Sequence, residues 1–133
     1  MMRIIRCALA AVAVVTLLGA PAVAHHSFAT QYDVSKPVEM KGSVTKVEWT
    51  NPHARIYIDV KEDSGQVSNW NFEMASPNVL VRNGWKRDSL KIGDQITVAG
   101  YLARRGEHMA IAGTIADSTG RPMFASLSSD LAK

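Results

Sequence analysis

Short segments in which apolar and polar residues alternate run through most of the chain, and turn signals separate them. Such alternation is typical of strands that bury one face. Two of these segments flank a turn around Gly65 and predict a hairpin. The predicted strands cover residues 38–49, 55–60, 67–75, 95–103 and 108–116, and a short sixth strand covers 123–127. The pattern predicts an all-β domain.

One segment between the third and fourth strands has a helical pattern instead. Ser76 is a favourable N-cap, Pro77 suits the first helical position and Gly84 suits the C-terminal stop. This order of elements predicts a small five- to six-stranded OB-like Greek-key barrel with one short helix. An open antiparallel sheet covered by one helix is the alternative.

The first predicted strand is irregular. Its alternation shifts by one residue between Val44 and Val47, and Gly42 lies nearby. Such a shift predicts a β-bulge or a strong bend, and barrels need bends of this kind to close.

The first 24 residues have the composition of a secretory signal peptide. Arg3 and Arg6 lie at the start, residues 7–19 are almost wholly apolar, and the predicted cleavage lies between Ala24 and His25. We therefore expect a periplasmic or secreted bacterial protein with no membrane span in the mature chain. A retained N-terminal anchor helix is the alternative.

The predicted mature chain holds one small domain. We divide it into an N-terminal arm at 25–37, a barrel at 38–127 and a C-terminal tail at 128–133. The single cysteine, Cys7, lies in the signal, so the mature domain has no disulfide. Loss of two arginines lowers the net charge from +3 to about +1.

This charge and the absence of a basic cluster in the sequence argue against a nucleic-acid partner. Serine does not occur in a G-x-S-x-G motif, which argues against one class of hydrolase. Asp59 and Glu73 could face each other across the hairpin, but one carboxylate pair on a sheet is usually solvated surface. We therefore expect a non-enzymatic binding or accessory module.

The histidines suggest a metal site. After cleavage, the α-amino group and the ring of His25 could chelate one ion together. Cu(II) prefers such tetragonal nitrogen ligation, and an amine that titrates near neutrality loses its proton at modest cost. We expect His53 to complete the site with help from His26, and His108 is the second choice.

Two alternatives need no metal. His25 and His26 could be a solvated arm, with His53 hydrogen-bonded within its own turn. The barrel could also be a protein-interaction or envelope-stress module, bound to an envelope protein through a face that carries Tyr57, Trp70 and Arg55.

Four segments carry a resemblance that covers about residues 25–125: "AHHSFATQYD", "GSVTKVEWTNPHARIYIDV", "NWNFEMASPNVLVRNGW" and "SLKIGDQITVAGYLARRG". In combination they resemble a family of small exported bacterial proteins classed as a domain of unknown function. The resemblance implies an OB-like barrel and implies no activity, ligand or catalytic residue. An aromatic residue often follows "NPHA" in that family. Here Arg55 takes this place, and a cation beside His53 argues against a metal ion.

Overall fold

The computed structural model describes residues 28–125. The chain divides into two compact units, Met1–Gln31 and Tyr32–Lys133. The described residues of the first unit, 28–31, form a helical turn. The predicted signal peptide with its cleavage site, both histidines at 25 and 26, and the tail at 128–133 lie outside the described residues. No helix within 28–125 has the length and apolar character needed to cross a membrane.

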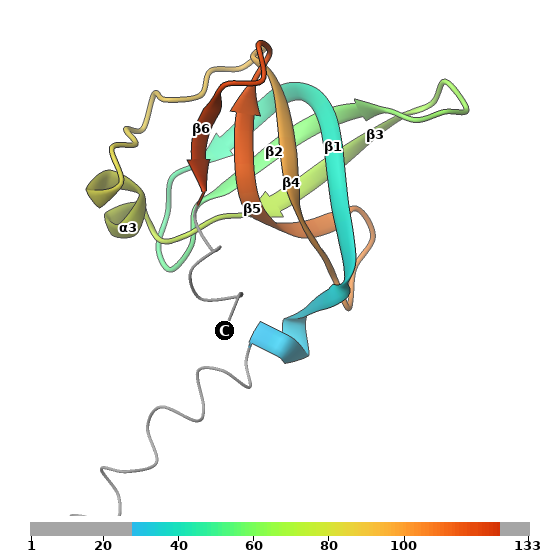
Figure 1. Ribbon diagram of the computed structural model, residues 1–133, viewed down its shortest axis with the longest axis horizontal. Coiled ribbons are helices and arrows are strands. Elements are labelled where there is room, and N and C mark those ends of the chain that lie inside the picture. Colours follow the sequence, from blue (N-terminus) through green and yellow to red (C-terminus); the bar gives the residue numbers. More distant parts are fainter. Residues whose placement is uncertain (1–27, 126–133) are drawn as a thin grey trace, which may run out of the picture. The chain divides into compact units, whose positions relative to one another are not determined.

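The described part of the second unit is a β-barrel with one helix (Figure 1). Its elements are β1 (Tyr32–Glu48), β2 (Arg55–Lys61), β3 (Val67–Glu73), α3 (Pro77–Arg82), β4 (Gln95–Ala103), β5 (Met109–Asp117) and β6 (Pro122–Ala125). The strand order is β3-β2-β1-β4-β5-β6, and neighbours in this order pair antiparallel. A parallel pairing of β3 with β5 closes five strands into a ring. The predicted all-β OB-like barrel is confirmed, with α3 between β3 and β4.

The first strand begins earlier than the sequence predicts. Residues 32–37, assigned above to the arm, belong to β1, because Tyr32 pairs with Ala103 and Pro37 pairs with Tyr101 on β4. The register shifts between Tyr32 and Pro37. This irregularity removes the regular alternation by which a strand is recognised in a sequence.

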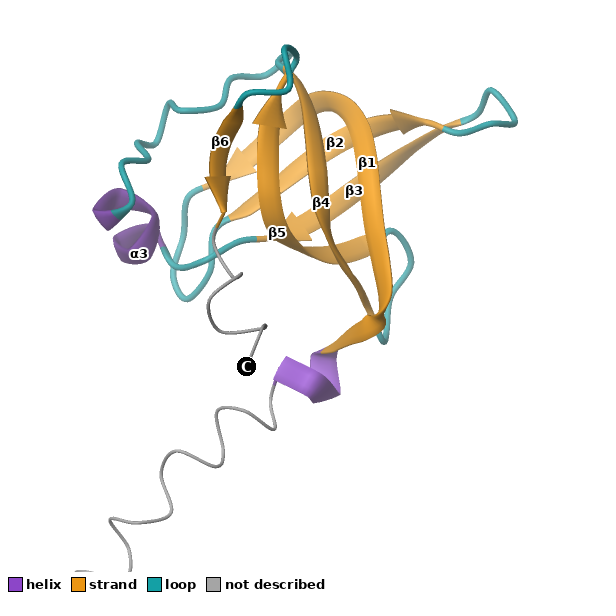
Figure 2. Cartoon of the chain, in the orientation of Figure 1, coloured by secondary structure: helices purple, strands orange, loops and turns teal. Residues whose placement is uncertain are grey.

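β1 is long and strongly bent, as Figure 2 shows. Its first part pairs with β4 and its last part pairs with β2. Gly42 pairs with Val60 on β2 and with Ile96 on β4, so it belongs to both ladders of β1. A Cβ atom at this position would collide with the carbonyl oxygen of Asp59. The predicted bulge is confirmed by a register shift between Val44 and Lys46.

Apolar side chains from all sides of the barrel fill its interior. The largest fully buried ones are Phe72, Ile56, Ile58, Leu80, Ile96, Val44 and Val98. Leu80 comes from α3, so the helix contributes to the same core as the strands. The hydroxyl of Ser76 caps this helix by accepting a hydrogen bond from the Val79 N–H (3.4 Å), and Gly84 follows it with a φ of 86°.

Asp117 organises the turn between β5 and β6. Its carboxylate accepts hydrogen bonds from the backbone N–H and hydroxyl of Thr119 and from the backbone N–H and Nε of Arg121. The hydrogen bond from the Thr119 hydroxyl is the main reason that the pKa of Asp117 falls from 3.8 to about 2.

This lowered pKa predicts a pH-dependent contribution to stability. A carboxylate with a depressed pKa in the folded state stabilises the fold above its unfolded pKa, and the contribution is lost as the pH falls through the folded pKa. The melting temperatures of the wild type and Asp117→Asn should therefore differ near neutral pH and converge between about pH 4 and pH 2. Asp63→Asn, in the exposed β2–β3 turn, is the control and should not show this convergence. A constant difference across the range would contradict the assignment.

Candidate functional site

The outer face of the β2–β3 hairpin carries polar cross-strand pairs. The inward side chains of Ile56, Ile58 and Phe72 are fully buried, so the intervening residues point outward. The outward pairs are Arg55 with Glu73, Tyr57 with Asn71, and Asp59 with Asn69.

One of these side chains, that of Glu73, is buried, with 8% of its surface exposed. Its Oε1 lies 2.8 Å from Nδ1 of His53, and its Oε2 accepts a hydrogen bond from Nη2 of Arg55 (2.5 Å). Nη1 of Arg55 also donates to Oδ1 of Asn71 (3.3 Å). A buried carboxylate is stable only when it is paired and hydrogen-bonded, and these partners meet that need.

Tyr32, at the start of β1, completes the surroundings of Glu73. Burial and the neighbouring Glu73 charge raise the pKa of Tyr32, and its hydrogen bond to Glu73 raises it further. Tyr32 therefore stays a neutral phenol whose O–H donates to the carboxylate. We call Tyr32, His53, Arg55 and Glu73 the Glu73 cluster.

The Glu73 cluster orients the ring of His53. In the neutral imidazole, Nδ1 carries the proton that it donates to Glu73, and Nε2 is then left with a free lone pair. The His53 side chain is 49% exposed. This arrangement suits a metal ligand or a proton acceptor.

The structure describes two of the four histidines proposed as ligands. His53 lies in the turn between β1 and β2. His108 precedes β5 with a φ of 51°, and its ring packs edge-on against Trp70 at a centroid distance of 5.0 Å. Within residues 28–125, no three His, Asp, Glu or Cys side chains gather closely enough to hold a metal ion. His25 and His26, the other two proposed ligands, lie outside those residues.

The predicted interaction face needs a correction. Tyr57 and Arg55 share the outer face, but Trp70 lies on the inner side of β3, two residues from Phe72, and packs against the core. Strand alternation separates them, because Trp70 pairs with the inward-facing Ile58.

The outer face continues onto β1 beside Tyr57. The Tyr57 hydroxyl donates to Oε2 of Glu48 (3.0 Å), and Nζ of Lys46 lies 5.1 Å from the centre of the Tyr57 ring. Lys46 also pairs with Glu48. These residues form a polar surface whose charges balance locally.

Sequence reasoning missed the role of Glu73 and the participation of Tyr32. It also placed Asp59 opposite Glu73, which is wrong, because Asp59 pairs with Asn69. The position of the turn at 62–66 indicates which residues of the two flanking strands lie opposite each other. Counting outward from that turn sets Lys61 opposite Val67 and Arg55 opposite Glu73.

The chain matches the model of a protein family. The model of a family of unknown function, DUF6152, matches residues 12–112. The matched span contains all four members of the Glu73 cluster. None of the curated proteins matches the chain.

Proposed function

We propose that this chain, which belongs to the family of unknown function DUF6152, is an exported, non-enzymatic module that binds a transition-metal ion, with Cu(II) as the preferred ion. The observation that carries the proposal is the contact of 2.8 Å between Nδ1 of His53 and Oε1 of Glu73. Histidines that ligate metals almost always donate their other ring N–H to a carboxylate, a carbonyl or a water molecule. His53 has this second contact, and its side chain is 49% exposed.

The remaining ligands must come from beyond residues 28–125, because the described residues supply no complete set. The sequence offers the α-amino group and the ring of His25, with His26 beside it, provided that the export signal is removed after Ala24. Nitrogen donors of this kind suit Cu(II).

Arg55 argued against a metal ion when only the sequence was considered. In the structure its guanidinium is bound to Glu73 and to Asn71. Its positive charge is therefore compensated by the Glu73 carboxylate, and the objection to a cation near His53 is weaker.

Calorimetric titration with Cu(II) tests the proposal on mature protein whose N-terminus is verified as His25 by intact mass. His53→Ala should weaken binding about tenfold or more, and an extra serine before His25 should weaken it similarly. His108→Ala is the matched control and should bind as the wild type does. Equal affinity of His53→Ala and the wild type would overturn the proposal.

A second candidate function is a metal-independent interaction module, because the polar surface of Lys46, Glu48 and Tyr57 is partly exposed. A photo-crosslinking residue at position 46 should then give one defined adduct with an envelope protein in exporting cells treated with a chelator. The same residue at position 67, in the strand β3, is the control. Absence of a defined adduct at position 46 would contradict this function.

A further inference from the structure

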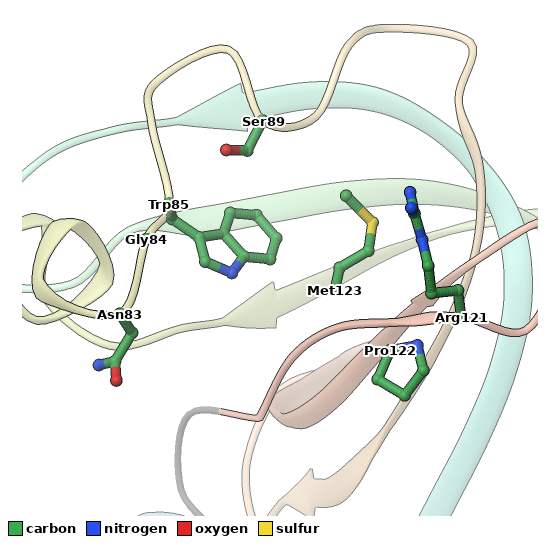
Figure 3. Close-up of a pocket in the computed structure, with 7 residues that line it drawn as sticks. All are labelled: Asn83, Gly84, Trp85, Ser89, Arg121, Pro122 and Met123. Carbon is green, nitrogen blue, oxygen red and sulfur yellow. The ribbon is translucent and has the colours of Figure 1, made fainter.

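A cleft of about 330 Å³ lies between the segment that follows α3 and the strand β6, on residues that the Glu73 cluster does not use. Asn83, Trp85 and Ser89 line one side, and Arg121, Pro122 and Met123 line the other. Figure 3 shows the indole of Trp85 projecting into the cleft toward the side chain of Met123. The volume of this cleft lies at the small end of the range for ligand pockets.

A second hollow of about 190 Å³ adjoins the first. Met123 lines both, and Leu90 and Ile96 form the apolar part of the smaller one. Because methionine is flexible and polarizable, its side chain can adjust to an apolar group placed between the two hollows. Trp85 is 5% exposed, so the apolar part of a ligand in the larger cleft would contact Met123 and the small accessible part of the Trp85 indole.

The polar groups of the larger cleft differ in what they can offer a ligand. Asn83 uses its Nδ2 to bond the carbonyl of Val79, and the Ser89 hydroxyl accepts from the N–H of Lys86. Nε of Arg121 donates to Asp117 (3.1 Å). The terminal nitrogens of Arg121 make no hydrogen bond to residues 28–125, and its side chain is 80% exposed.

Among the residues that line the larger cleft, Arg121 carries a charge, and this charge favours an anion. The charged residues Lys86, Arg87 and Asp88 belong to the segment that supplies one wall but do not line the cleft, and Asp94 and Asp117 line the adjoining hollow. In the opposite wall, Nε of Arg121 donates a hydrogen bond to Asp117. Both terminal nitrogens of Arg121 therefore remain available to an acceptor. A guanidinium presents such nitrogens as a fork that matches a carboxylate.

We infer that this cleft binds a small organic carboxylate with a flat apolar body. The carboxylate pairs with the terminal nitrogens of Arg121, and the apolar body packs against the indole of Trp85 and the thioether of Met123. The inference does not depend on the metal site.

Proton–nitrogen correlation NMR on metal-free, chelator-treated mature protein tests this inference with benzoate as the probe. Benzoate should shift the indole N–H resonance of Trp85 in a saturable way. The other two indole resonances, identified with Trp49→Phe and Trp70→Phe, should stay in place. Benzylamine, which has a similar ring and the opposite charge, should leave the Trp85 resonance unchanged.

Arg121→Gln should weaken benzoate binding several-fold, whereas Lys61→Gln, which removes an exposed cation from β2, should not. Three results would overturn the inference: no saturable shift at Trp85, equal shifts with benzylamine, or unchanged benzoate affinity in Arg121→Gln. Because no metal is present, none of these results bears on the proposed copper site.

Discussion

Replacing Gly100 with alanine should destabilise the barrel by about 3 kcal/mol, which is a large part of the stability of a small domain. Gly100 lies on β4 at a register shift opposite β5. A Cβ atom here would collide with the main-chain carbonyl of Ile111, and no side-chain rotation can relieve that collision. The strands β4 and β5 would have to separate.

Gly113→Ala on the neighbouring strand is the matched control. Its added Cβ would lie 3.4 Å from the carbonyl oxygen of Ala99, which is an ordinary contact, so we expect a small effect. Urea unfolding followed by tryptophan fluorescence gives both values. A Gly100→Ala protein that unfolds at the same urea concentration as the wild type would contradict the described β4–β5 pairing.

Glu73→Gln should lower the free energy of unfolding by about 2 kcal/mol, because it removes the buried charge that binds Arg55 and keeps the side-chain shape. Arg55 and His53 are partly exposed, so water compensates part of the loss. The same variant should weaken Cu(II) binding by about tenfold, since a carboxylate that orients a ligating histidine contributes this much. Chemical unfolding and calorimetry measure the two effects.

Glu48→Gln is the control for Glu73→Gln, because Glu48 is a partly exposed carboxylate that accepts hydrogen bonds from Tyr57 and Lys46 on the same face. It should change stability much less and leave copper affinity unaltered. Wild-type stability in Glu73→Gln would contradict the role of the Glu73 cluster in the fold. Unaltered copper affinity would contradict only its role in orienting His53.

The sequence predicted most of the barrel because its strands obey local rules. Strand alternation, the capping residues of α3 and the phase shift after Val44 all depend on near neighbours in the chain. The start of β1 could not be found in this way, because the register shift between Tyr32 and Pro37 interrupts the alternation and only pairing with β4 holds this segment in the sheet.

The candidate site was only partly predictable. The sequence singled out His53, and the hairpin register could have set Arg55 opposite Glu73. It could not show that Glu73 is buried, because the burial depends on contacts made only in the folded chain. Tyr32, more than forty residues before Glu73 in the sequence, supplies one of them. The cleft beside Trp85 likewise depends on β6, far along the chain.

Pulsed electron paramagnetic resonance of the Cu(II)-loaded mature protein tests the central claim most directly, because it detects the remote nitrogen of each imidazole bound to copper. The spectrum of the wild type should contain the signal of the His53 imidazole together with that of a terminal histidine. His53→Ala should lose one imidazole, and His108→Ala should lose none. Identical remote-nitrogen signals in the wild type and His53→Ala would contradict the assignment of His53 as a copper ligand.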